Sequence, residues 1–70
     1  MTENTKNTVY NLRTKKGLTQ EDLAEKVGIT RQTVISIEKG NYTPSVLLAL
    51  RIATVFKLSV EDIFQISYGK

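Results

Sequence analysis

The residues best suited to chemistry lie in one polar stretch, Arg31–Lys39. At about 100° per residue of an α-helix, Gln32, Ser36 and Lys39 share one face, opposite the apolar residues of the stretch. Arg31 lies nearer the flank of that face, but its side chain is long. Arginine pairs with two acceptors of guanine and glutamine pairs with adenine. The stretch therefore predicts a helix whose outer face is either equipped to read the edges of bases or an ordinary solvated face.

Bond-making chemistry has little support in this sequence. Its 70 residues include no cysteine and no histidine, which excludes Ser-His and Cys-His pairs and the ordinary zinc sites. Three carboxylates, Glu21, Asp22 and Glu25, fall on a helical hairpin too short to frame a substrate cleft. We therefore expect no enzyme activity, no cofactor and no metal.

Cap and stop residues divide the first half of the chain into three expected helices. Thr8 is expected to cap the first helix, and Gly17 to stop it. Thr19 opens the second helix in a capping-box pattern, and Gly28 ends it. Thr30 is a good N-cap for the third helix, so only a short turn separates the second helix from the third.

The second half of the chain predicts two more helices and one strand. Thr43 is expected to cap the fourth helix, Val46–Phe56, with Pro44 in its first turn. Ser59 caps a short fifth helix, from Val60 to about Phe64. Beyond it, apolar and polar residues alternate as in a strand, which needs a partner for its backbone groups. We expect an all-α fold with a loose arm over 1–7, a helical domain over 8–64 and a tail over 65–70.

The chain is short and basic, and its charge is uneven. It has 10 Lys+Arg against 7 Asp+Glu, a formal net charge of +3, with +4 over residues 1–57 and −1 over residues 58–70. A domain this small buries only about 60% of its unfolded surface, so self-association is an expected source of stability. No apolar run approaches the roughly 20 residues of a membrane span, and Met1–Asn7 is too polar for a signal peptide. We expect a soluble, cytoplasmic protein.

From about Val9 to Phe64 the sequence resembles the XRE family, the Cro-like and phage-repressor-like helix-turn-helix regulators. The resemblance is carried by the run TQEDLAEKVGITRQTVISIEKG over residues 19–40 and by the segments YTPS, ALRIA and SVEDIF after it. The chain is similar to short stand-alone bacterial members, which are mostly dimeric repressors. The resemblance implies a five-helix DNA-binding domain.

The resemblance also implies contacts with DNA, position by position. The base-reading candidates are Arg31, Gln32, Thr33 and Ser36. The candidates for the phosphate backbone are Gln20, Thr30, Lys39, Asn41, Tyr42 and Thr43. Phosphate contacts set register and affinity, whereas base contacts set the choice of sequence. An ordinary explanation competes with these roles, since a short turn also makes a plain helical hairpin with a solvated outer face.

Two further groups are expected to be structural. In the family an arginine at the position of Arg13 pairs with the carboxylate at the position of Glu38, and we interpret that pair as a tie between the first and third helices. Leu47 and Leu48 are apolar where many relatives are polar, and both are expected to be exposed; Leu47 marks either surplus core or a docking patch. The expected dimer interface consists of Leu47, Phe64, Ile66 and Tyr68.

These observations together predict a sequence-specific DNA-binding regulator. We expect a small homodimeric repressor that inserts the helix Arg31–Lys39 into the major groove of a palindromic operator on double-stranded DNA. Its control would come from its own concentration, from a partner protein, or from salt and temperature, and not from a small-molecule effector. The alternative is a protein-interaction module, antitoxin-like or an adaptor, in which the helix-turn-helix serves mainly as a scaffold.

Overall fold

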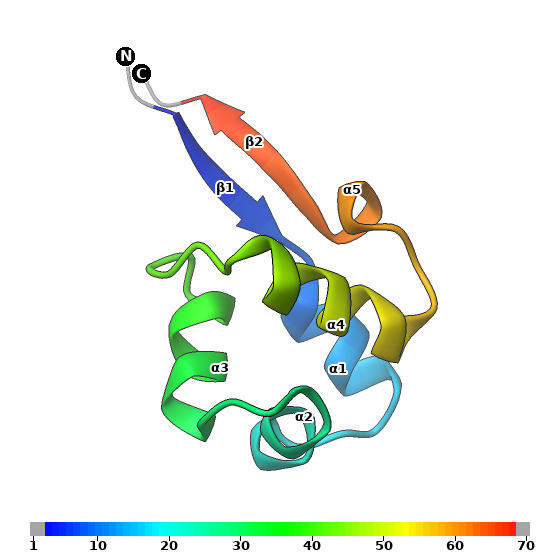
Figure 1. The fold of residues 1–70 in the computed structure, drawn as a ribbon. Coiled ribbons are helices and arrows are strands. Elements are labelled where there is room, and N and C mark those ends of the chain that lie inside the picture. Colours follow the sequence, from blue (N-terminus) through cyan, green and yellow to red (C-terminus); the bar gives the residue numbers. More distant parts are fainter. Residues whose placement is uncertain (1–2, 69–70) are drawn as a thin grey trace.

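Five short helices and a two-stranded sheet make up the part of the chain that the computed structural model describes, residues 3–68 (Figure 1). In chain order the elements are β1 (Glu3–Asn7), α1 (Val9–Lys15), α2 (Gln20–Val27), α3 (Arg31–Glu38), α4 (Val46–Phe56), α5 (Val60–Ile63) and β2 (Phe64–Tyr68). The five expected helices and the C-terminal strand are confirmed. No helix within these residues is both long enough and apolar enough to cross a membrane.

The N-terminal segment differs from the loose arm that the sequence suggested. Residues 3–7 form β1, which pairs antiparallel with β2 in a register that runs from Glu3 opposite Tyr68 to Asn7 opposite Phe64. The pairing gives both strands partners for their backbone groups, which explains why neither remains a coil. The resulting ribbon projects beyond the helices (Figure 1). Met1, Thr2 and the last two residues of the expected tail lie outside the described part.

Local hydrogen bonds at the helix starts follow the sequence at three of five helices. Capping boxes open α2 and α5, where Thr19 and Ser59 each accept a hydrogen bond from the backbone three residues on. Thr30 caps α3 by accepting from the Thr33 backbone N–H. These caps give the orphan N–H groups of each first turn an acceptor.

Two expected caps are wrong. Thr8 occupies the N-cap position of α1, but its side chain makes no cap bond; the Val9 N–H donates instead to Asn7 Oδ1, at 3.1 Å. Ser45, not Thr43, caps α4, with the Leu48 N–H 3.2 Å from Ser45 Oγ. α4 therefore begins at Val46, after Pro44 and not at it, because Ser45 is the residue whose side chain accepts from an N–H of the first turn.

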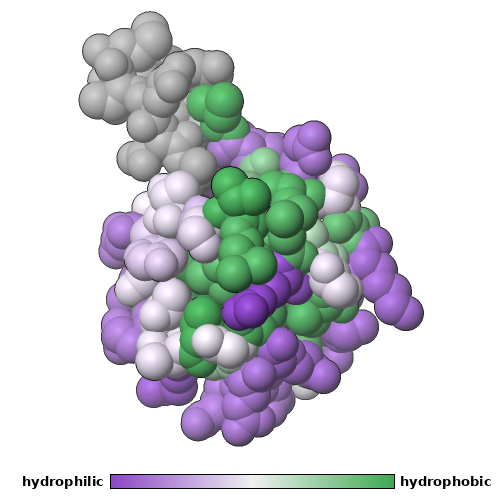
Figure 2. Space-filling view, in the orientation of Figure 1, coloured by the Kyte–Doolittle hydropathy of each residue, from purple (hydrophilic) through white to green (hydrophobic). Residues whose placement is uncertain are grey.

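The core lies where α4 crosses the other helices. Its fully buried side chains come from every helix: Val9, Leu23, Val27, Val34, Ile37, Ile52 and Ile63. α4 contributes Leu48, Ala49, Ile52 and Ala53 to burial, so the expected exposure of Leu48 is wrong, yet several of its other apolar side chains remain exposed. Figure 2 shows a hydrophobic area over α4 that is framed by hydrophilic side chains and has one strongly hydrophilic side chain within it.

Candidate nucleic-acid interface

A three-residue turn joins α2 to α3 and fixes the angle between them. Gly28 ends α2 in the left-handed region, at φ +77°, where a side chain would be strained. The Gly28 and Ile29 N–H groups both donate to the Ala24 carbonyl, at 2.9 and 3.0 Å. Thr30 then starts α3. The two helices therefore form a closely held helix-turn-helix, with the half-buried Ile29 packed against the core.

The two faces of α3 are chemically distinct. Val34 and Ile37 are buried to 1% exposure and attach the helix to the core. Arg31, Gln32 and Lys39 are exposed. These long polar side chains stand away from the core with their hydrogen-bonding groups available, as base and phosphate recognition requires.

The other two base-reading candidates are less free. Ser36 is half-buried on the same outer face. Thr33 is half-buried too, and its hydroxyl lies 2.9 Å from the Thr30 hydroxyl. The structure therefore brings Arg31, Gln32, Ser36 and Lys39 to one surface, whereas Thr33 turns toward the helix start.

The acidic residue of α3 is neutralised inside the domain. Glu38 accepts from Arg13 at two atoms, with Nε 2.6 Å from Oε2 and Nη2 3.2 Å from Oε1. The two side chains are only 9% and 6% exposed. The expected Arg13–Glu38 pair is thus present, and it leaves the outward charge of α3 positive.

Arg13 has further partners that anchor it. Its Nη1 donates to the Leu18 carbonyl at 2.8 Å, and its guanidinium carbon lies 5.3 Å from the centre of the Tyr10 ring. The hydrogen bond to Glu38 raises the pKa of Arg13 above its ordinary value, and burial opposes that shift. The guanidinium therefore remains charged and ties together α1, the loop after it and α3.

Gln20, one of the phosphate candidates, also has a partner inside the domain. Its Nε2 donates to Glu38 Oε1 at 3.2 Å, so one amide hydrogen serves the buried pair. The Gln20 amide has a second N–H hydrogen, which is the donor left for a phosphate contact. Composition and spacing gave no sign of this bond. The one available signal was the position of Gln20 directly after the Thr19 cap, at the start of a helix beside α3.

The loop after α3 holds the remaining phosphate candidates. Gly40 adopts φ +79°, and the Asn41 N–H donates to the Ser36 carbonyl at 2.9 Å, which closes the helix end. Asn41, Tyr42 and Thr43 are exposed along this loop. They follow Lys39 and Gly40 in the chain, so Lys39 and these three residues lie close to one another at the end of α3.

Asn7 is a structural contact that sequence reasoning missed. Its side chain caps α1 and also donates from Nδ2 to the Ile37 carbonyl near the end of α3, at 2.9 Å. An asparagine in a polar segment gave no hint of a partner 30 residues away.

Residues 9–63 match the family described as Helix-turn-helix, the XRE-type group. The chain belongs to this family. It is a DNA-binding family of transcriptional regulators.

Curated relatives of this helix-turn-helix chain carry the same description. The uncharacterized HTH-type transcriptional regulator YgzD of Bacillus subtilis is 56% identical over 59 residues, which cover 84% of this chain and 89% of the relative. An uncharacterized HTH-type transcriptional regulator of Methanocaldococcus jannaschii is 54% identical over 59 residues, with the same coverage.

Solved structures agree with the fold. The restriction-modification controller protein C.AhdI of Aeromonas hydrophila is 35% identical, with a TM-score of 0.71 over 77% of this chain and 82% of that chain. The transcriptional regulator VanUg shares the fold at 17% identity, with a TM-score of 0.77 over 99% of this chain and 92% of that chain.

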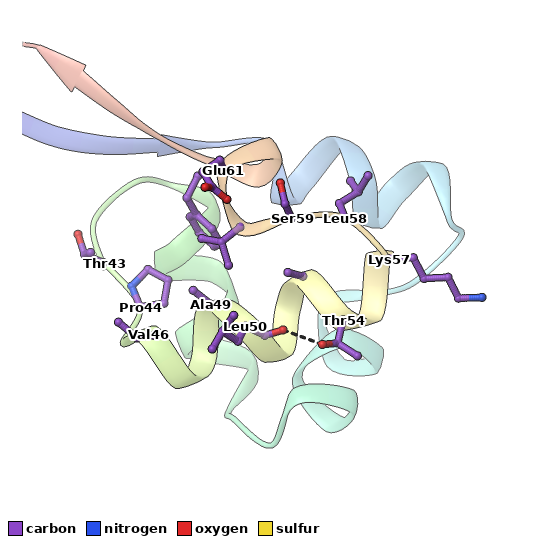
Figure 3. A pocket seen from close by; sticks show the side chains of 13 residues that line it. Thr43, Pro44, Val46, Ala49, Leu50, Thr54, Lys57, Leu58, Ser59 and Glu61 are labelled. Atoms are coloured by element: carbon purple, nitrogen blue, oxygen red, sulfur yellow. Dashed lines mark hydrogen bonds between the residues drawn. The ribbon is translucent and has the colours of Figure 1, made fainter.

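A second surface, separate from α3, is an apolar groove between α4 and α5. Figure 3 shows Val46, Ala49 and Leu50 on α4 along one side, with Leu58 and Glu61 on the opposite side. The groove encloses about 900 Å³. Val46 is 77% exposed and Leu50 is 52% exposed, so large apolar side chains line it in open contact with solvent.

The predicted dimer residues divide around this groove. Phe64 lines it and is half-buried. Leu47 is 59% exposed but is not among the groove-lining residues, and Ile66 is 58% exposed on β2. The side chain of Tyr68 lies outside the described part of the chain. The sequence therefore predicted an apolar patch on α4 but not the exposure of Val46 and Leu50. In a helix that is apolar on nearly every side, no residue type indicates which side is exposed.

Proposed function

We propose that this chain is a homodimeric transcriptional repressor that inserts α3 into the major groove of a palindromic operator. The observation that carries the proposal is the outer face of α3. That face presents Arg31, Gln32 and Lys39 to solvent, while the carboxylate of Glu38 is withdrawn to Arg13. A helix with this face fits the major groove in width and offers the donors that guanine and adenine accept.

Sequence choice is assigned to the N-terminal half of α3. Arg31 suits guanine and Gln32 suits adenine, each by two hydrogen bonds. Ser36, being short and half-buried, reaches bases through water. Thr33 has the smallest part, because its hydroxyl is engaged with Thr30.

Register is assigned to the ends of α3. Lys39, Asn41, Tyr42 and Thr43 would contact phosphates after the helix, and Thr30 and the free hydrogen of Gln20 would do so before it. A phosphate near the start of α2 also meets the positive end of that helix. These contacts would make the affinity fall with added salt.

The occupant proposed for the α4–α5 groove is a second copy of the chain. The exposed Val46 and Leu50 offer apolar surface that a partner would remove from water, and the domain is too small to be rich in core of its own. A two-fold dimer must hold two α3 helices about 34 Å apart to meet successive major grooves. The body measures 23 and 22 Å across its shorter axes, which suits two copies side by side.

Repression is proposed to follow from occupancy of the operator. The restriction-modification controller C.AhdI and the HTH-type regulators among the relatives carry descriptions of gene control, which agree with this assignment. The level of the protein or a partner protein would then set the response. A small molecule that released the pure protein from DNA would contradict this part of the proposal.

The proposal is tested by selection from a randomised duplex library. The wild-type chain is run beside the Arg31→Ala/Gln32→Ala variant, with Glu25→Ala on the exposed side of α2 as the matched control. We expect wild type and Glu25→Ala to return the same palindrome and the double variant to lose it. Weak binding without sequence preference, shared by all three, would reduce α3 to a phosphate-attracting surface and overturn the proposal.

The α4–α5 groove also favours a second candidate function. A protein-interaction module, antitoxin-like or an adaptor, would use Val46, Leu50 and Phe64 to hold a different protein and keep the helix-turn-helix as scaffold. The two candidates separate on the same double variant. The scaffold hypothesis predicts that Arg31→Ala/Gln32→Ala leaves the activity unchanged, whereas the repressor hypothesis predicts its loss.

A further inference from the structure

Asn7 connects three elements through one side chain. It is the last residue of β1, and its Oδ1 accepts from the Val9 N–H at the start of α1, at 3.1 Å. Its Nδ2 donates to the Ile37 carbonyl in the last turn of α3, at 2.9 Å. The side chain is half-buried, so both bonds are partly shielded from water. The junction of the terminal ribbon with α1 is thereby bonded to the end of α3.

The position of this bond on α3 gives it an effect beyond local capping. Carbonyls in the last turn of a helix lack donors from within the helix. The Ile37 carbonyl already accepts from the Gly40 N–H at 3.0 Å, and Asn7 supplies a second donor. The tie therefore acts where α3 passes into the loop that carries Asn41.

Two side chains from outside α3 hydrogen-bond to this end of the helix, and they bond to different groups. Arg13 holds the side chain of Glu38, whereas Asn7 holds the backbone of Ile37 directly. A side-chain tie tolerates small rotations of the helix, but a bond to the carbonyl restrains the backbone itself. Recognition requires placement of the contacting groups to within about 0.5 Å.

We propose that Asn7 is a positioning residue of the DNA-binding surface. By fixing the end of α3 against the β1–α1 junction, it sets how α3 and its following loop meet DNA together. The proposal rests on the function proposed for α3. Asn7 itself need not touch DNA, because one of its amide hydrogens and its carbonyl oxygen already have partners inside the domain.

The test separates the two bonds of Asn7. Asn7→Asp keeps an oxygen for the Val9 N–H but has no N–H for the Ile37 carbonyl. Asn7→Ser keeps an acceptor without adding a negative charge, which controls for repulsion from phosphates. The matched control is Ser59→Ala, which removes the cap of α5 and leaves α3 untouched. Binding is measured on the duplex that the wild-type chain selects from a random library, at a temperature where circular dichroism shows all four proteins folded.

Both Asn7 variants are expected to bind that duplex about tenfold more weakly than wild type, a change equivalent to about 1.4 kcal/mol. Ser59→Ala is expected to bind as wild type does. Wild-type affinity in both Asn7 variants would overturn the proposal. An equal loss in Ser59→Ala would also overturn it, because the effect would then be one of general stability.

Amide hydrogen exchange in the free protein separates a failure of this proposal from a failure of the proposed function. If the library returns no sequence, DNA recognition by α3 fails, but exchange at Gly40 and Asn41 can still be measured. Faster exchange there in both Asn7 variants than in Ser59→Ala supports the tie to α3. Unchanged exchange shows that the bond does not hold the helix end and overturns the proposal.

Discussion

Two solvent-exposed surfaces, the outer face of α3 and the α4–α5 groove, have opposite chemistry. The outer face of α3 is polar and positively charged, and its one carboxylate is paired inside the domain. The α4–α5 groove is apolar, with Val46 at 77% and Leu50 at 52% exposure. Water molecules hydrogen-bond to the polar groups on the outer face of α3 until a ligand with acceptor groups replaces these molecules. The α4–α5 groove is unfavourable in water and gains by being covered.

The contrast shows how so small a domain can separate two tasks. A polar helix face contributes specificity, because wrong partners leave its donors unpaired. An apolar groove contributes association energy with little selectivity, since burial is non-directional. If the proposed function is right, substitutions on one surface should leave the other intact, and only residues of the shared scaffold should disturb both.

The largest effect is expected from the scaffold residue Glu38. Glu38→Ala leaves the Arg13 guanidinium, in a side chain only 9% exposed, without its carboxylate. Breaking a buried pair in this way costs about 3–5 kcal/mol. We expect a large fall in melting temperature, measured by circular dichroism, and with it the loss of both surfaces. Glu25→Ala, on an exposed carboxylate, is the control and should change stability by less than about 0.5 kcal/mol. An unchanged melting temperature in Glu38→Ala would show that the pair is not structural.

The next largest effect is a loss of DNA affinity caused by substitutions on α3. In Arg31→Ala/Gln32→Ala two bidentate base contacts are lost, each worth about 1–3 kcal/mol. We expect affinity for the selected duplex to fall at least about thirtyfold. Fluorescence anisotropy measures the affinity, and sedimentation shows whether self-association is unchanged. A parallel loss of self-association would mean that the two surfaces are not independent.

A smaller effect is expected from a substitution in the groove. Leu50→Asp removes one leucine from the proposed contact, which is worth about 1.5–3 kcal/mol. We expect self-association to weaken by at least about tenfold, with DNA affinity falling because two linked sites bind better than one. Leu47→Asp is the matched control, since Leu47 is equally exposed but lies outside the groove. If Leu47→Asp has the greater effect in sedimentation, the interface is centred on the other side of α4.

The smallest effect concerns Asp22 and touches neither surface. Hydrogen bonds from Thr19, the backbone N–H first, hold the pKa of Asp22 below its ordinary value of 3.8. The unfolded chain therefore binds this proton more readily, so the stabilisation is full above about pH 3.8 and is lost as the pH falls through the lower folded value. Between about pH 5 and about pH 2, the melting temperature of Asp22→Asn should fall less than that of wild type. Equal falls would show that the capping box is not the acid-sensitive element.

Much of this fold follows from local sequence. Glycine stops and Ser or Thr caps act within four residues, so the ends of α2 and the starts of α3 and α5 were predictable. β1 was not, because Glu3–Asn7 has no alternation of apolar residues and becomes a strand only by pairing with β2 at the other end of the chain.

The candidate site was predictable in part for the same reason. The outer face of α3 follows from helical periodicity, and the structure places Arg31, Gln32, Ser36 and Lys39 together on it. The Arg13–Glu38 pair came from family resemblance, not from spacing. The contacts of Gln20 with Glu38 and of Asn7 with Ile37 join residues far apart in the chain, and no local pattern encodes them.

The central claim is that α3 holds DNA while the α4–α5 groove holds a second copy of the chain. The most direct test is to titrate the selected duplex into isotope-labelled protein and follow every backbone amide by NMR. In protein that sedimentation shows to be self-associated before the titration, large shifts are expected at Arg31, Gln32 and Lys39, with little change at Leu50 and Phe64. Shifts centred on Leu50 and Phe64, with α3 unmoved, would contradict it.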